Sequence, residues 1–325
     1  MRKWLVLLTV VVLAAVGVGL ATSAHGATTK RPKIAFIDAI AGIEFYQQMI
    51  CAAQTAATAG GADFKYYEPT KFDVGIQTSM INSIAATHPD AVVVAPDDPV
   101  ASYAPLEALH KAGVKIVVVD GTLKNTSIAA AEVLSDNRAG GLAAGKLMNN
   151  LVGKAGPVLA IANVPGNPVQ LERVKGFAEA VSVKKGMKPL PVQYSKYDTN
   201  RVASIVSATL QAHPDLVGIF TTAGIDASGV ATALKEAGKT GTVRLITYDA
   251  LPSEVQSLKA HQVDGLIAQR PAAEGTIGVE RALEALNGKT STPKVIRTGV
   301  VGITRGNLSQ PTVRAALYTK CGPFK

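Results

Sequence analysis

The residues best placed to do chemistry are two aspartates that each end a predicted strand. The apolar run 114–119 leads into Asp120, and the run 243–248 leads into Asp249. Ligands of open α/β sheets bind outside the carboxyl ends of the strands, so two facing sheets would bring both carboxylates to one cleft. A carboxylate there accepts hydrogen bonds from the hydroxyl groups of a small molecule. The pattern therefore indicates ligand binding.

Patterns typical of enzymes are missing from the sequence. There is no Gly-x-Ser-x-Gly turn, and the five histidines assemble no catalytic triad. His88 and His213 have no partner at metal-ligand spacing. Residues 140–146 resemble the phosphate-binding motif Gly-x4-Gly-Lys, but Leu147 replaces the Ser or Thr that the motif requires. We interpret these glycines as helix-packing positions and expect no enzyme activity, metal or cofactor.

The elements that must position the two aspartates occur in a unit that the chain contains twice. Three landmarks recur at a constant separation of 125 residues: Lys71-Phe72-Asp73 and Lys196-Tyr197-Asp198, His88-Pro89-Asp90 and His213-Pro214-Asp215, and Gly113 and Gly238. The strand-end aspartates are 129 residues apart, which indicates a four-residue insertion at 239–242. A constant offset over three landmarks predicts two similar lobes.

Each copy is predicted to fold as helix, strand, helix, strand. Asp73 and Asp198 can cap helices whose apolar residues recur at helical spacing, and the proline after each histidine ends that helix. The Val/Ile runs suit parallel strands that are covered on both faces. Gly113 and Gly238 can adopt the left-handed conformation that ends a helix. The unit is therefore a right-handed crossover in a doubly wound sheet.

Further elements are predicted outside the repeat. The strands are at residues 33–38, 64–67, 130–134, 157–162, 263–268 and 298–303. Helices are predicted at residues 44–59, 170–183 and 272–286, and another helix follows Ser135-Asp136-Asn137 and runs through Leu151. The tail is polar and partly helical. Asp97 and Asp98 are interpreted as a turn and helix-cap pair outside the core of the site.

Length and composition indicate a secreted globular protein. The 325 residues are 47% hydrophobic and 18% charged, which leaves room for two α/β domains. Residues 1–26 have two basic residues, an apolar run and a small-x-small end, so we expect a secretory signal peptide cleaved before Ala27. The alternative, an uncleaved membrane anchor, requires a longer apolar run. The mature protein is expected to be soluble in the periplasm or the extracellular space.

Charge and cysteine content limit the partners and the crosslinks that we expect. Removing Arg2 and Lys3 with the leader lowers the formal net charge from +9 to +7. No dense basic run or aromatic-interleaved basic patch accompanies this charge, so nucleic acid is not an expected partner. Cys51 and Cys321 are the only cysteines. In an oxidising compartment they could pair and tie the tail to the first helix, although the sequence alone leaves this open.

Several short segments together match one family in order and spacing. They are Ile43-Glu44-Phe45-Tyr46, Val118-Val119-Asp120, Ser135-Asp136-Asn137, residues 171–177, Tyr248-Asp249 and Ile267-Ala268-Gln269. From residue 33 to residue 303 the series resembles the type I periplasmic sugar-binding proteins, the ribose- and galactose-binding group that serves ABC importers. The resemblance implies an α/β fold: two similar doubly wound parallel-sheet lobes joined by a three-crossing hinge, with a sugar held between them.

The resemblance also implies which residues bind the ligand. They are two aromatic residues, three aspartates, one arginine and one glutamine: Phe45, Tyr46, Asp120, Asp136, Arg173, Asp249 and Gln269. The aromatic faces would cover the C–H surface of a sugar ring, the carboxylates would accept hydrogen bonds, and the arginine would donate them. Asp136 falls at a hinge crossing near the cleft. The alternatives are that Phe45-Tyr46 is plain core and that Arg173 pairs with Glu172 or Glu179 on the surface.

The chain departs from the family pattern at positions that supply polar contacts in many members. Ile43-Glu44 stands where Asn-Pro is common, and Gly121 stands where an arginine often follows the aspartate. Ala95 and Ala223-Gly224 replace Asn or Asp. We therefore expect a roomier and less polar pocket than a pentose site. A polyol, a deoxy-sugar, a substituted sugar or another small oxygenated molecule would suit such a pocket.

The sequence thus predicts an extracytoplasmic solute-binding protein that captures a sugar-like or polyol ligand and delivers it to an ABC permease. The alternative is a ligand-sensing periplasmic protein that presents its ligand state to a membrane chemoreceptor or kinase. Lobe one is predicted at residues 27–135 plus 270–297, and lobe two at 136–269 plus 298–325. The expected partners are the small-molecule ligand and the permease, and the protein is expected to be a monomer.

Overall fold

The structure, a computed structural model, describes residues 30–320. Residues 31–320 belong to one compact unit. The predicted signal peptide at residues 1–26 and the cysteine Cys321 lie outside the described residues. Cys51 is disulfide-bonded, and its pairing with Cys321 stays a prediction.

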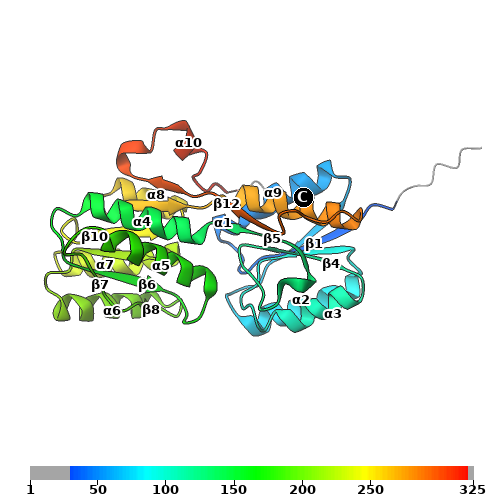
Figure 1. Cartoon of the computed structure of the whole chain (residues 1–325), viewed down its shortest axis with the longest axis horizontal. Coiled ribbons are helices and arrows are strands. Elements are labelled where there is room, and N and C mark those ends of the chain that lie inside the picture. The colour runs from blue at the N-terminus through cyan, green and yellow to red at the C-terminus, as the bar shows by residue number, and fades with distance from the viewer. Residues whose placement is uncertain (1–29, 321–325) are drawn as a thin grey trace, which may run out of the picture. The chain divides into compact units, whose positions relative to one another are not determined.

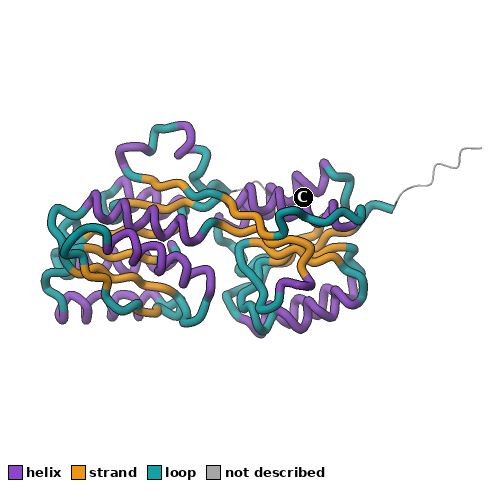
Figure 2. The backbone as a smooth tube through the Cα atoms, in the orientation of Figure 1, coloured by secondary structure: helices purple, strands orange, loops and turns teal. Residues whose placement is uncertain are grey.

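The strands of this unit form two separate sheets (Figure 2). The first sheet is parallel throughout, in the order β12-β5-β4-β3-β1-β2, and its strands are β1 (Lys33–Ile37), β2 (Asp63–Tyr67), β3 (Ala91–Val94), β4 (Lys115–Val119), β5 (Ala129–Ser135) and β12 (Val295–Thr298). The second has the order β13-β11-β10-β9-β6-β7, with β8 also paired to β6; its strands are β6 (Pro157–Ala162), β7 (Lys188–Pro189), β8 (Gln193–Tyr194), β9 (Gly218–Thr221), β10 (Arg244–Tyr248), β11 (Gly265–Ala268) and β13 (Val301–Ile303). These sheets confirm the prediction of two parallel-sheet lobes, although β13 is antiparallel to β11.

Helices cover both faces of each sheet (Figure 1). Those of the first lobe are α1 (Glu44–Ala59), α2 (Val74–Ile84), α3 (Tyr103–Lys111) and α9 (Pro271–Leu286). Those of the second are α4 (Asn137–Leu151), α5 (Pro168–Ser182), α6 (Thr199–Ala212), α7 (Ala227–Glu236), α8 (Pro252–Lys259) and α10 (Pro311–Arg314). Every residue of β3 is buried: Val93 packs into the cluster that includes residues of α1 and α9, and Val92 and Val94 pack into the cluster of α2 and α3. This two-sided burial explains the continuous Val/Ile runs.

The local signals of the repeat are confirmed in both copies. The carboxylate of Asp73 accepts hydrogen bonds from the first backbone N–H groups of α2, and Asp198 does the same for α6. Gly113 and Gly238, which follow α3 and α7, have φ angles of +94° and +63°. A side chain would strain that conformation, so glycine ends both helices for the same reason.

The chain crosses between the lobes three times, at β5–α4, β11–α9 and β12–β13. The prediction of one strand at residues 298–303 is wrong, because β12 ends in the first sheet at Thr298 and β13 begins in the second at Val301. Both pieces have a strand-like pattern, but backbone hydrogen bonds to different sheets require a break between them. Glu274 of α9 accepts hydrogen bonds from the hydroxyls of Ser135 and Thr298, which ties two of the crossings together.

The glycines at residues 140–146 are confirmed as helix-packing positions within α4. A Cβ atom on Gly141 would lie 2.1 Å from the carbonyl oxygen of Arg173, and one on Gly145 would lie 2.7 Å from that of Phe177. Helices α4 and α5 therefore approach more closely than side chains would allow. This contact fixes α5, the helix that carries Arg173.

Candidate functional site

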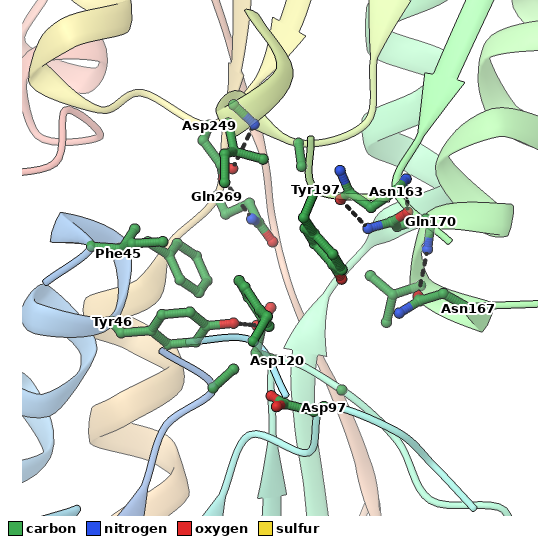
Figure 3. Close-up of a pocket in the computed structure, with 18 of the residues that line it drawn as sticks. Phe45, Tyr46, Asp97, Asp120, Asn163, Asn167, Gln170, Tyr197, Asp249 and Gln269 are labelled. Atoms are coloured by element: carbon green, nitrogen blue, oxygen red, sulfur yellow. Dashed lines mark hydrogen bonds between the residues drawn. The ribbon is translucent and has the colours of Figure 1, made fainter. Parts of the chain in front are cut away.

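A cavity of about 140 Å³ is lined by residues of both lobes. This volume is far above the roughly 10–15 Å³ that one water molecule requires. Six of the seven predicted ligand-binding residues line it: Phe45, Tyr46, Asp120, Arg173, Asp249 and Gln269. Figure 3 shows Phe45 and Tyr46 projecting from one side and Asn163, Asn167 and Gln170 from the other.

Phe45 and Tyr46 occupy the first turn of α1, directly after the β1–α1 loop. Their rings pack edge to face with centroids 5.0 Å apart. The Tyr46 hydroxyl donates a 2.8 Å hydrogen bond to Oδ2 of Asp120. Both side chains are nearly buried, as core residues would be, and both line the cavity; contact with a ligand stays a prediction.

The two strand-end aspartates have equivalent backbone geometry. Asp120 follows β4 with a φ of +56°, and Asp249 follows β10 with a φ of +75°. The backbone N–H of Asp120 donates to Val133, and that of Asp249 donates to Ile267, so each residue is still bonded to the next strand. Left-handed residues other than glycine are costly and persist only where their surroundings hold them. The same backbone geometry at the end of a strand thus places both carboxylates at the cavity.

Burial sets the electrostatics of Asp120. It raises the pKa of this carboxyl above its ordinary value, and the charge of Asp249 acts in the same direction. The Arg173 guanidinium and the hydrogen bond from Tyr46 lower that pKa. A hydrogen-bond donor from a ligand would further favour the ionised form.

Arg173 is buried and is held by several protein groups. Its Nε donates to Asn137 (2.7 Å), its Nη1 to the carbonyl of Thr222 (2.8 Å) and its Nη2 to Oε1 of Gln269 (2.9 Å). The guanidinium also lies 3.7 Å from the ring centroid of Tyr248. Within the described residues these bonds use three of its five N–H donors.

The surface ion pairs that were considered for Arg173 belong to another arginine. Arg138 of α4 forms salt bridges with Glu172 and Glu179 on the neighbouring helix. Arg173 faces inward from the same helix as these glutamates, so its guanidinium is available to the cavity.

Asn163 and Gln170 form a second polar group that the sequence analysis missed. The Gln170 amide donates to Oδ1 of Asn163 and accepts from its backbone N–H, both at 2.6 Å. Asn163 also donates to Oδ2 of buried Asp226, whose pKa burial raises to about 7. Asn163 directly follows β6, so the strand-end rule that identified Asp120 could have identified it as well.

Asp136 does not lie with the other predicted residues. Its Oδ1 accepts from the backbone N–H of Ala139 and caps α4, and it is not among the described residues that line the cavity. Asp97, by contrast, lines the cavity although it was interpreted as a turn residue. Its neighbour Asp98 performs the turn role, because its carboxylate accepts from the backbone N–H groups of Val100 and Ala101.

Four of the six residues that depart from the family pattern line the cavity: Ile43, Gly121, Ala223 and Gly224. Glu44 and Ala95 are not among the described residues that line it. None of the four residues at the cavity has a polar side chain, so the polar contacts of the site come from the neighbouring carboxylates, amides and Arg173.

Two aromatic rings from opposite lobes meet at the cavity. Phe72 and Tyr197 both line it, and they stack with centroids 4.9 Å apart and planes 9° from parallel. These residues occupy the same position in the two copies of the repeat, directly before the capping aspartates. The 125-residue repeat already pairs these two aromatic positions in the sequence, but the prediction used only the aspartates that follow them.

Within residues 30–320, no group of three or more His, Cys, Asp or Glu side chains is arranged to hold a metal ion. The same residues include no helix with the length and apolar content needed to cross a bilayer. The carboxylates, amides, guanidinium and aromatic rings that line the cavity suit hydrogen bonding and ring stacking with a small polar molecule.

Two solved structures similar to this chain are solute-binding proteins with a bound sugar. One is an ABC transporter solute-binding protein from Agrobacterium vitis with α-D-tagatopyranose, which has 29% sequence identity and a TM-score of 0.84 and covers 89% of this chain and 100% of its own. A second protein from Agrobacterium vitis, with bound D-fucose, has 26% identity and a TM-score of 0.80 and covers 88% of this chain and 100% of its own.

Curated relatives extend the similarity over most of the sequence. The D-ribose/D-allose-binding protein of Pseudomonas aeruginosa is 27% identical over 304 residues, which are 91% of this chain and 94% of the relative. The ribose import binding protein of Bacillus subtilis is 27% identical over 217 residues, 67% of this chain and 70% of the relative. The family model for the periplasmic binding protein domain matches residues 34–290. Fold, cavity and sequence thus agree, and the chain belongs to the periplasmic binding protein domain family.

Proposed function

We propose that this protein captures a sugar-like or polyol ligand in the cavity between its lobes and delivers it to an ABC permease. The observation that carries the proposal is one cavity lined by carboxylates of both lobes, Asp120 and Asp249, together with Arg173. Its relatives are binding proteins of transport systems and not enzymes, which agrees with the lack of a catalytic constellation in the sequence.

The proposed chemistry assigns one task to each kind of side chain. Asp120 and Asp249 accept hydrogen bonds from ligand hydroxyls, and Arg173 donates to ligand oxygens; such charge-assisted bonds contribute about 1.5–3 kcal/mol each. Phe45 and Tyr46 cover the apolar surface of the ligand. Because the ligand contacts both lobes, binding favours the closed state by its differential affinity. A permease can then distinguish loaded from empty protein.

The comparisons support a monosaccharide-sized ligand. The relatives bind ribose or allose by name, and the similar structures hold tagatose or fucose. Ile43, Gly121 and Ala223 line the cavity without a polar side chain. They therefore offer a ligand fewer hydrogen-bond donors than the polar residues found at these positions in many family members. We therefore include polyols and deoxy-sugars with the aldoses and ketoses as candidates.

The transport role is favoured over the sensing role, because a relative is named as an import binding protein and the similar structures are transporter components. The family places the protein outside the cytoplasm. We propose further that residues 1–26 are removed on export. Lobe one would comprise residues 27–135 plus 270–297 and lobe two 136–269 plus 298–325. Strand pairing within each sheet supports this division except at Thr298, which pairs with Ser135 in the first sheet.

A ligand panel measured by thermal shift and calorimetry tests the proposal. A ligand at 100 times its Kd should stabilise the protein by about 2.7 kcal/mol. Asp120→Ala and Arg173→Ala should remove most of that stabilisation. Arg138→Ala and Asp215→Ala, which replace surface residues of the same types in the second lobe, should retain it. The site would be refuted if both cavity variants bound like the wild type, and the function if no sugar or polyol bound at all.

A further inference from the structure

The C-terminal tail brings one tyrosine to the back of the cavity. Tyr318 follows α10 by a few residues, and only 3% of its surface is exposed. It is not among the described residues that line the cavity, yet it contacts three that do: Asp249, Gln269 and Phe45. We infer that Tyr318 is a positioning residue, which holds ligand-binding side chains of both lobes in place. This inference rests on the proposed function of the cavity.

The Tyr318 hydroxyl accepts one hydrogen bond and donates another. The backbone N–H of Gln269 donates to this oxygen at 2.8 Å. A phenolic hydroxyl has a single proton, so that proton is left to donate to Oδ1 of Asp249, 3.2 Å away. Burial raises the pKa of Tyr318 well above its ordinary value, and the charge of Asp249 adds to this effect. The hydroxyl therefore stays protonated and remains a donor to the carboxylate.

Hydrogen bonds connect the Tyr318 contact to other ligand-binding side chains of the site. The same Oδ1 of Asp249 accepts from Nε2 of Gln269 at 2.7 Å, and Oε1 of Gln269 accepts from Arg173 at 2.9 Å. Tyr318, Asp249, Gln269 and Arg173 thus form one hydrogen-bonded series. Displacing Asp249 would also remove the group that orients Gln269, and with it one fixed partner of Arg173.

Asp249 requires such support because its backbone is left-handed. Its φ of +75° lies in a region that is costly for residues other than glycine. The backbone N–H of Tyr318 donates to the carbonyl of the next residue, Ala250, at 3.1 Å. The tail therefore holds this strand end through both the backbone and the side chain.

The ring of Tyr318 contacts the opposite lobe. Its centroid lies 5.7 Å from that of Phe45 at the start of α1, with the planes tilted by 59°. Tertiary packing thus places one residue of the tail between a polar ligand-binding residue of the second lobe and an aromatic one of the first. Tyr318 consequently links the two halves of the site without touching the cavity.

The substitution Tyr318→Phe tests the hydroxyl and keeps the ring. The matched control is Tyr103→Phe, because the Tyr103 hydroxyl also donates to a carboxylate, that of Glu107 at 3.0 Å, but lies on α3 away from the cavity. With D-ribose, D-allose, D-tagatose and D-fucose as probes, Tyr318→Phe should raise the Kd of the bound probes by about tenfold. Tyr103→Phe should leave the Kd within about twofold.

A double-mutant cycle separates positioning from a general loss of stability. If Tyr318 acts through Asp249, Tyr318→Phe should change Kd by less than about twofold in an Asp249→Asn background. Independent, multiplying effects on Kd would overturn the inference, as would an unchanged Kd in the single variant.

A measurement without ligand keeps this inference distinct from the proposed function. Crystal structures of the ligand-free wild-type and Tyr318→Phe proteins should show the side chains of Asp249 and Gln269 displaced in the variant. Unchanged side chains would overturn the positioning role. If no sugar or polyol bound the wild type, the proposed function would fail, while this structural comparison would still decide the role of Tyr318.

Discussion

At the scale of single residues, two adjacent aspartates show how position decides role. The carboxylate of Asp98 accepts from the backbone of Val100 and Ala101 and closes a turn. Asp97 lines the cavity, where it accepts hydrogen bonds from the Gln77 amide and from the backbone N–H of Asp73. Burial raises the pKa of Asp97 to about 7. Its charge therefore changes within the physiological pH range.

We predict that Asp97→Asn weakens ligand binding, because an amide is a weaker acceptor for ligand hydroxyls than a carboxylate. The Kd at pH 8 should rise by about tenfold, and the effect should be smaller at pH 6, where the wild-type carboxyl is largely protonated. Calorimetric titrations at both pH values measure this difference. Asp98→Asn is the control and should bind like the wild type; equal effects of the two substitutions would contradict the assignment.

At the scale of elements, the duplicated unit places equivalent helix starts on opposite sides of the cavity. Asp73 caps α2 and Asp198 caps α6, and the aromatic residue before each cap extends toward the other lobe. Phe72 and Tyr197 consequently stack across the lobes. The Phe72 ring also lies 6.5 Å from that of Tyr46, whose hydroxyl is bonded to Asp120. The proposed opening of the lobes would break this stack.

Removing the Phe72 ring should therefore speed ligand release. Stacked aromatic pairs contribute about 0.5–1.5 kcal/mol beyond their buried area, so Phe72→Ala should raise the dissociation rate by roughly two- to tenfold. The association rate should change little, because the open lobes meet the ligand before the rings stack. Stopped-flow fluorescence measures both rates. Phe72→Tyr, which keeps an aromatic ring, serves as the control; a wild-type dissociation rate in Phe72→Ala would speak against a role for the stack.

At the scale of the whole molecule, several acidic groups are buried within the lobes. Burial raises the pKa of Asp38 to about 9, that of Glu274 to about 8 and that of Asp226 to about 7. In the unfolded chain these groups ionise near pH 4. Between the unfolded and folded pKa values the folded protein binds more protons, so its free energy of unfolding falls as pH rises.

We predict that the ligand-free protein is more stable at pH 5.5 than at pH 8.5. Each extra proton held by the folded state changes stability by about 1.4 kcal/mol per pH unit. Urea unfolding at three pH values measures the slope. Asp226→Asn, which cannot ionise, should flatten the slope between pH 5 and pH 7. Stability that increases toward pH 8.5 would show that these carboxyls are not buried as described.

The features that the sequence could predict are those that depend on neighbouring residues. Asp73 and Asp198 cap helices because a carboxylate reaches the next N–H groups, and Gly113 and Gly238 end helices because a left-handed φ favours glycine. The strand-end rule located Asp120 and Asp249, and the resemblance added Arg173. These inferences need only the local chain or a constant repeat.

The features that only the tertiary structure decided depend on residues far apart in the chain. Residues 298–303 divide between two sheets because their backbone partners, β5 and β11, belong to different lobes. Phe72 meets Tyr197, and Tyr318 reaches both Asp249 and Phe45, through contacts that span tens to hundreds of residues. By itself the sequence determined two similar lobes with polar strand ends. Packing between the lobes decided which side chains share the cavity, because side-chain proximity across a fold is not encoded in local spacing.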